Sequence, residues 1–152
     1  MRLIDHLRTD SVLTGLRLTR VDDVLQVLVD AACSTWSIPD PEHILSLVRE
    51  REAKMTTGIG HFLAVPHAKC DQVAETRMAC CTLPSGVDFR SPDKQPVRIA
   101  FLLLSPSASA GSHVRALATI SRITPDLLER LVAAPNPVEF LALLEAAEAN
   151  RT

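Results

Sequence analysis

The chain has 152 residues, of which 47% are hydrophobic and 22% charged, and its formal net charge at pH 7 is −2. Its basic residues are scattered and the net charge is small, so binding of nucleic acid through a basic stripe is not expected. The longest apolar run, residues 99–104, is far shorter than the ~20 residues of a membrane-spanning helix, and Asp5 interrupts any signal-peptide pattern, which predicts a cytoplasmic protein.

The N-terminal third predicts one strand followed by two helices. Residues 11–18 alternate loosely and are rich in leucine and β-branched residues, as a first strand would be. Thr19 is the expected N-cap of a helix with apolar positions at Val21, Val24, Leu25, Leu28 and Ala32. Asp40 and Pro41, a cap followed by a first-position proline, predict a second helix that ends at residues 55–58 and buries Ile44, Leu45, Leu47 and Val48.

The middle of the chain predicts three strands. A short apolar strand is expected to end at His67, and two longer strands are expected at about residues 73–83 and 97–104. Between those two, residues 84–96 are rich in proline and polar side chains, which indicates a surface loop.

Three helices are expected in the C-terminal third, beginning near His113, at Thr124-Pro125 and at Asn136-Pro137. No linker is long or polar enough to divide the chain, and the length is sufficient for one hydrophobic core. Strands interleaved with helices therefore predict an α/β sandwich that forms a single domain over residues 1–152, with the sheet between helical layers.

The four cysteines have no CxxC spacing and are expected to be reduced thiols that fill the core. A zinc site is conceivable from His61, His67, Cys70, Cys80 and Cys81. However, Cys80 and Cys81 are neighbours in a predicted strand, so their side chains should point to opposite faces and cannot serve one metal. We therefore expect no metal site.

His67 is the strongest candidate for a reactive residue. A short apolar run leads to it, Pro66 interrupts strand pairing, and the small Ala68 leaves room beside the ring. Imidazole is substantially an uncharged nucleophile near neutral pH, because its unperturbed pKa is about 6.5. A histidine after an apolar strand is nevertheless more often a partly buried residue with satisfied hydrogen bonds than a catalyst. The residues around His67 are therefore needed to choose between the two interpretations.

Several strings together resemble one known family. They are Glu50-Arg51-Glu52, Thr57-Gly58-Ile59-Gly60-His61, Ala64-Val65-Pro66-His67-Ala68-Lys69, Gln95-Pro96-Val97 and Phe101-Leu102-Leu103-Leu104-Ser105-Pro106, with His113 and Leu117-Ala118. This set resembles the type-2 EIIA domain of the bacterial phosphotransferase system, the class that includes fructose, mannitol and nitrogen-regulatory members. The resemblance covers nearly the whole chain, and the string around His67 is its most specific part.

The resemblance implies a central mixed β-sheet flanked by helices and an activity at His67. By likeness to the family, His67 accepts a phosphoryl group on its Nε2 from a phosphohistidine on an HPr-like carrier and passes it to an EIIB component. His113 resembles the family's second active-site histidine, and Arg51 resembles an arginine near the same site. Phe62 and Ala68 depart from the family, which usually has glycine at both positions, and this leaves partner choice and rate open.

The chemistry is consistent with these residue types. Phosphoryl transfer needs a nucleophile in line and donors for three charged oxygens. His67 would be the nucleophile, and donors are available from the backbone N–H groups after it, from His113 and from the planar guanidinium of Arg51. Nothing resembles the GxxxxGK[ST] nucleotide cradle. The expected donor is therefore a phosphoprotein, with no cofactor required.

Other interpretations of these residues remain open. His113 could be a solvent-exposed histidine at a helix N-terminus, and Arg51 could belong to a solvated charge run over residues 49–52. His61 could serve in structural hydrogen bonding. Around His67, the expected docking surface is an apolar rim formed by Phe62, Val65, Pro66 and Ala68.

Two main functions follow from the resemblance. One is relay of phosphate toward a sugar permease through EIIB, and the other is a nitrogen-regulatory switch in which the phosphorylation state of His67 controls other protein partners. A third interpretation is a binding domain in which His67 is never modified. The sequence does not name the sugar, the carrier or the regulated target.

Overall fold

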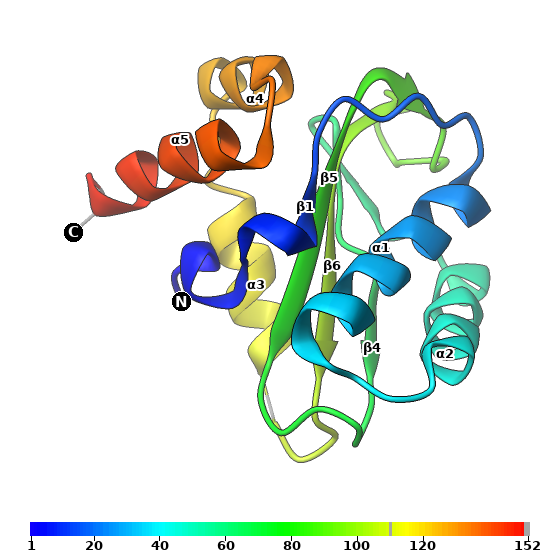
Figure 1. Ribbon diagram of the computed structural model, residues 1–152. Coiled ribbons are helices and arrows are strands. Elements are labelled where there is room, and N and C mark those ends of the chain that lie inside the picture. The colour runs from blue at the N-terminus through cyan, green and yellow to red at the C-terminus, as the bar shows by residue number, and fades with distance from the viewer. Residues whose placement is uncertain (110, 151–152) are drawn as a thin grey trace.

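A computed structural model describes residues 1–109 and 111–150. Its centre is a six-stranded sheet with helices on both faces (Figure 1). Parallel and antiparallel pairs both occur, so the sheet is mixed. The predicted α/β sandwich with a mixed sheet is therefore confirmed. None of the helices in the described part of the chain is long and apolar enough to cross a membrane.

The strands follow the order β1-β5-β6-β3-β2, and β4 also pairs with β6. Their bounds are β1 Val12–Leu13, β2 Gly58–Gly60, β3 Leu63–Ala64, β4 His67–Lys69, β5 Arg77–Val87 and β6 Val97–Ser105. Strand β6 is antiparallel to β5 and parallel to both β3 and β4, which follow one another along its other side. The two long strands thus form the centre of the sheet.

Helices cover the sheet in two layers (Figure 1). Helices α1 and α2 pack on one face, whereas α3, α4, α5 and the N-terminal 3₁₀ turns pack on the other. The bounds are η1 Leu3–His6, η2 Thr9–Ser11, α1 Val21–Trp36, α2 Pro41–Lys54, α3 Ser112–Ile120, α4 Pro125–Ala133 and α5 Pro137–Ala149. The buried carboxylate of Glu148 accepts hydrogen bonds from the N–H groups of Leu3 and Ile4, which joins the N-terminal turn to α5.

Side chains of the central strands alternate between two hydrophobic cores. Cys81, Leu102 and Leu104 belong to the core under α1 and α2, and Cys80 and Leu103 to the core under α3 to α5. This alternation follows from the two-residue period of a strand. The prediction that Cys80 and Cys81 point to opposite faces is confirmed.

The helix starts that carry local capping signals are confirmed. Side chains of Asp40, Thr124 and Asn136 each accept a hydrogen bond from the backbone three residues on, and each is followed by a first-position proline. Thr19 was wrongly predicted as a cap, because α1 begins one residue later with Arg20 at its N-cap.

The first predicted strand is wrong over most of its length. Only Val12–Leu13 joins the sheet, whereas residues 14–18 lie outside the ladder. Gly15 adopts a left-handed φ of 68°, and its N–H donates to the side chain of Thr82 instead of to a strand partner. Residues 15 and 16 still lie beside β5, because the N–H groups of both bond to Thr82, but they do not continue the regular strand ladder.

The predicted strand ending at His67 is also wrong in its boundaries. Strands β2 and β3 form an antiparallel pair, and His67 is the first residue of β4. Farther along, β5 begins at Arg77 instead of Val73 and continues to Val87 through an irregularity after Thr82. The predicted loop over residues 84–96 therefore shortens to the segment between β5 and β6.

Candidate active site

Strand β4 places His67 at an open edge of the sheet. Among the described strands, β4 pairs with β6 alone, where His67 lies beside Leu103. Helix α2 packs against β4 from one side, and α3 supplies His113 from the other. A half-buried imidazole is thereby held between two helices without being enclosed.

The His67 ring has a defined orientation and one free nitrogen. Its Nδ1 lies 2.9 Å from the carbonyl oxygen of Val65. A carbonyl can only accept a hydrogen bond, so Nδ1 carries the proton and donates it. The neutral ring then has its lone pair on Nε2, which is the nitrogen available for chemistry.

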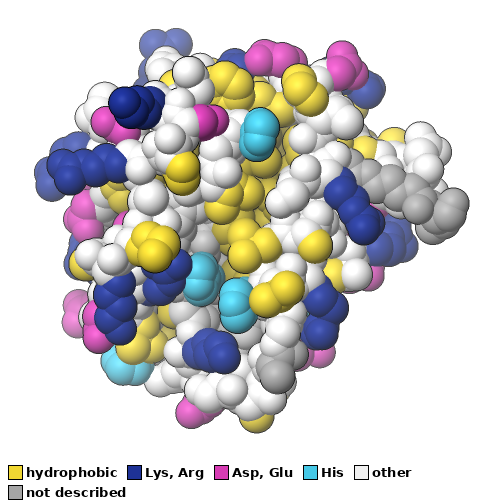
Figure 2. Space-filling view, turned by 180° about the vertical axis from the view of Figure 1, so that it is seen from behind, with side chains coloured by type: hydrophobic (Ala, Val, Ile, Leu, Met, Phe, Trp, Pro, Cys, Tyr) yellow, Lys and Arg dark blue, Asp and Glu magenta, His cyan; other side chains and the backbone are white. Residues whose placement is uncertain are grey.

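His113 stacks on His67, with ring centroids 5.6 Å apart and ring planes 11° from parallel. It is the second residue of α3, after Gly111 at the N-cap and Ser112. Figure 2 shows two adjoining histidine side chains on the face opposite that of Figure 1, with lysine and arginine side chains nearby. The structure therefore brings the two predicted site histidines together and removes the interpretation of His113 as an isolated surface residue.

The surroundings of His67 lower its pKa below the ordinary value of 6.5. Partial burial is the largest cause, because it disfavours the charged ring, and the positive charges of Arg51 and His113 lower the pKa further. The hydrogen bond to the Val65 carbonyl opposes this shift. His67 is therefore held neutral, the form in which imidazole is a nucleophile.

Arg51 also belongs to the site, because it lines a cavity of about 350 Å³ together with His67 and His113. It lies in the last turn of α2, where its Nη1 donates to the carbonyl oxygen of Met55 at 2.7 Å. That bond uses one of the five guanidinium N–H groups, so the remaining donors can serve a ligand. The structure thus places all three predicted site residues around one cavity.

A hydrogen-bonded relay from α2 supports the His67 ring. The carboxylate of Glu52 accepts from the backbone N–H of Thr57 at 2.7 Å. The Thr57 carbonyl accepts from the N–H of Val65 at 2.9 Å, and the Val65 carbonyl accepts from His67. Glu52 is therefore a supporting residue to which sequence reasoning assigned no role, although the Glu50-Arg51-Glu52 string contains it.

His61 and Phe62 form the turn between β2 and β3, away from this cavity. Both adopt left-handed φ values, 55° and 67°, which glycine accepts most readily. The His61 N–H donates to the Asp93 carboxylate at 2.9 Å. This bond comes from the backbone of His61, so it holds the turn without assigning a role to the imidazole ring. The left-handed φ of Phe62 explains why glycine would suit its position.

The predicted apolar rim around His67 is wrong. Val65, Pro66 and Ala68 are buried, since Val65 and Ala68 pack into the two cores. The exposed side chains at the cavity are charged instead: Glu50, Lys54 and Lys69. Sequence reasoning missed Lys54, and the signal was its three-residue spacing from Arg51 on one helix.

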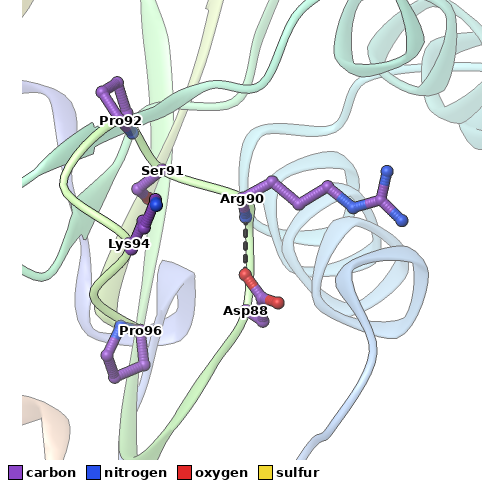
Figure 3. Close-up of a pocket in the computed structure, with 6 residues that line it drawn as sticks. All are labelled: Asp88, Arg90, Ser91, Pro92, Lys94 and Pro96. Carbon is purple, nitrogen blue, oxygen red and sulfur yellow. Dashed lines mark hydrogen bonds between the residues drawn. The ribbon is translucent and has the colours of Figure 1, made fainter.

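Other hollows in the described part of the chain lack the site histidines. One, of about 610 Å³, lies at the loop between β5 and β6, where the Arg90 side chain points away from Pro92 and Pro96 (Figure 3). Another, of about 430 Å³, is lined by His61, Phe62 and the segment between α3 and α4. Within the described residues, no group of three or more His, Cys, Asp or Glu side chains is placed to hold a metal.

The amino-acid sequence matches the family model described as phosphoenolpyruvate-dependent sugar phosphotransferase system, EIIA 2, over residues 5–147. A fructose-specific EIIA component from Haloferax volcanii is 30% identical over 133 residues, which cover 82% of this chain and 86% of that protein. A nitrogen regulatory protein from Bradyrhizobium diazoefficiens is 29% identical over 126 residues, which cover 83% and 82%, respectively. The two relatives represent different roles at similar identity.

Solved structures share the fold. The nitrogen regulatory protein IIA-Ntr from Neisseria meningitidis aligns with a TM-score of 0.84 at 21% identity, covering 93% of this chain and 98% of that one. The mannitol enzyme IIA from Escherichia coli, determined in complex with its phosphorylated enzyme IIB, aligns with a TM-score of 0.79 at 19% identity, covering 92% and 97%. At these identities the likeness establishes the architecture alone.

Proposed function

The chain belongs to the EIIA type-2 family of the phosphoenolpyruvate-dependent sugar phosphotransferase system, and from this premise we propose that it is a phosphocarrier that accepts and releases a phosphoryl group at His67. Members of this family are components of a phosphotransferase system. The observation that carries the proposal is the His67 ring, which is fixed through Nδ1, has Nε2 free and stacks on His113.

The proposed step is an in-line transfer between two imidazoles. The lone pair on Nε2 of His67 attacks phosphorus, and the nitrogen–phosphorus bond of the donor phosphohistidine breaks. The electron pair of that bond returns to the donor ring, so no metal or nucleotide enters the balance. The Val65 carbonyl stabilises the positive charge that the His67 ring gains on bonding phosphorus.

His113 and Arg51 have complementary roles in this proposal. Both residues line the same cavity as His67, and their N–H groups would donate to oxygens of the transferred group. Arg51 brings a permanent charge and a planar set of N–H donors, and the His113 ring brings one further N–H donor. Together they would stabilise the negative charge that spreads over three oxygens during transfer.

The phosphoryl donor is an HPr-like phosphocarrier, and the acceptor is an EIIB component. The solved complex of mannitol enzyme IIA with phosphorylated enzyme IIB supports a direct EIIA–EIIB contact, since that IIA shares this fold. Membership of a phosphoenolpyruvate-dependent system supports an HPr-like donor. Delivery to EIIB during sugar uptake is thus the function we favour, in line with the fructose-specific relative.

The test is phosphorylation by the general phosphotransferase enzyme, HPr and phosphoenolpyruvate. We expect one labelled position that is lost in acid, because phosphoramidate bonds to imidazole hydrolyse in acid whereas serine and threonine esters survive. His67→Ala should abolish labelling, and His43→Ala, on the exposed surface of α2, should retain it. Undiminished labelling of His67→Ala would show that another residue is the nucleophile.

The alternative is a nitrogen-regulatory switch. The nitrogen regulatory relative matches this chain nearly as well as the fructose-specific one, at 29% against 30% identity. In this function the same chemistry at His67 would change which proteins bind, and phosphate would not be delivered onward. Efficient transfer from phosphorylated protein to an EIIB component favours transport, whereas partner binding that depends on phosphorylation without such transfer favours regulation.

A further inference from the structure

The chain has three lysines, and two of them line the His67 cavity. Lys69 follows His67 by two residues in β4, and Lys54 ends α2, whereas Lys94 lies in the distant loop between β5 and β6. Lysine is scarce in this chain, in which thirteen of the sixteen basic residues are arginines. The two cavity lysines therefore stand out from the scattered basic surface.

Strand and helix geometry direct both lysines toward the same site. Residues two apart in a strand share a face and lie about 6.6 Å apart, so Lys69 is on the side of β4 that presents His67. Residues three apart on a helix are neighbours, so Lys54 accompanies Arg51 on α2. Because α2 packs against β4, cations from two elements meet around one cavity.

The charge of this cavity matches a phosphoryl group. Arg51, Lys54 and Lys69 carry three positive charges, and Glu50 is the one carboxylate among the described lining residues, which leaves a surplus of two. No carboxylate of the described residues forms an ion pair with either lysine. A phosphoryl group carries nearly two negative charges at pH 7.

We propose that Lys54 and Lys69, together with Arg51, bind the oxygens of a phosphoryl group attached to His67. This inference rests on the phosphocarrier function proposed above and adds two residues to its site. Both ammonium groups are exposed, so they act from the rim of the cavity and are partly screened by salt.

The test uses Lys54→Gln, Lys69→Gln and the double variant, with Lys54→Arg and Lys69→Arg as charge-preserving variants. Lys94→Gln is the matched control, because Lys94 is exposed and remote from the cavity. Each protein is phosphorylated chemically with phosphoramidate, so the measurement does not depend on any carrier. A ³¹P NMR titration then gives the pKa of the phosphoryl group, and transfer from phospho-HPr is timed separately.

We expect each glutamine variant to raise the phosphoryl pKa, since a lost cation disfavours the dianion, and to slow transfer about two- to fivefold, as for exposed ion pairs. The arginine variants should restore both quantities, and the effect should shrink at high salt. Unchanged phosphoryl pKa values in the double variant would overturn the proposal. A raised KM for phospho-HPr with an unchanged phosphoryl pKa would also overturn it, because the lysines would then act in carrier recruitment.

The outcomes separate this inference from the phosphocarrier function. Failure of phospho-HPr to label the unaltered protein would count against the function, yet the chemically phosphorylated protein would still test the lysines. If phospho-HPr labels the unaltered protein normally and the lysine variants have the same phosphoryl pKa and transfer rate as it, only the inference about the lysines is rejected. Melting temperatures of all variants should match the unaltered protein, because both side chains are exposed and without ion pairs among the described residues.

Discussion

The imidazole of His67 on β4 stacks almost parallel on that of His113 on α3, so two residues separated by 46 positions form one site. The stack leaves the Nε2 edge of His67 available, since its Nδ1 donates to Val65. It also brings a second ring with donor capacity to the place where a phosphoryl group would lie.

Removal of the His113 donor should slow phosphoryl transfer without unfolding the protein. A hydrogen bond to a charged group contributes about 1.5–3 kcal/mol, and the half-exposed position of His113 favours the low end, so His113→Ala should lower the rate about tenfold. His113→Gln, which keeps an N–H donor, should recover part of the loss. Transfer timed by quenched flow checks this, with His43→Ala as control, and an unaltered rate for His113→Ala would remove His113 from the mechanism.

Acceptor activity should persist below pH 6.5, the ordinary pKa of histidine. Burial, followed by Arg51 and His113, lowers the pKa of His67, so the neutral ring is lost only when the pH falls through that lowered value. Arg51→Gln removes a positive neighbour and should raise the pKa of His67. An NMR titration of the ring and a pH profile of phosphorylation measure both effects. A midpoint at or above 6.5 in the unaltered protein would contradict the expectation.

The same shift predicts how stability depends on pH. Between the lowered pKa of His67 and 6.5, the unfolded chain binds more protons than the folded one, so acid favours unfolding there. The contribution is fully present above pH 6.5 and is lost as the pH falls through the lowered pKa. His67→Gln should flatten the pH dependence of the free energy of unfolding in this window. Urea titrations followed by the fluorescence of Trp36, the single tryptophan, measure it.

Loss of the Glu52 carboxylate should destabilise the protein and loosen the site. Thr57 is buried, and its N–H donates to the Glu52 carboxylate. An unsatisfied buried donor costs about 1–3 kcal/mol, so Glu52→Ala should lower the free energy of unfolding by about that amount. Glu52→Gln should lower the free energy of unfolding by a smaller amount. Glu50→Ala, at an exposed position, should leave it unchanged. Equal stability of Glu52→Ala would show that the relay does not support His67.

Features that depend on residues close together in the sequence were predictable, whereas features that depend on distant residues were not. Caps at Asp40, Thr124 and Asn136 are encoded within four residues, so the three helix starts were predictable. The turn at His61 and Phe62 was not, because phenylalanine rarely adopts a left-handed backbone and the enrichment of histidine in that conformation does not by itself locate a turn. Its conformation is supported by Asp93, which lies 32 positions away from His61.

The candidate site shows the same division. His67 was predictable because its string is local, and the family resemblance supplied His113 and Arg51. The structure places all three around one cavity, and their roles remain predictions. Lys54 was missed because its relation to His67 depends on how α2 packs against β4, and Val65 was assigned to an exposed rim because burial by the α3–α5 layer is a tertiary effect.

Phosphorylation of His67 should change which proteins bind this surface. The unmodified cavity has a surplus of two positive charges, and a phosphoryl group of nearly two negative charges would cancel it. Acidic partners should therefore bind the unmodified protein better, and arginine-bearing partners the phosphorylated protein. Affinity capture from lysate with the two forms side by side measures the change, and His67→Ala treated with phosphoramidate controls for modification elsewhere. Identical partner sets with equal retention would reject the regulatory switch, and return of phosphate to an EIIB component would then support transport.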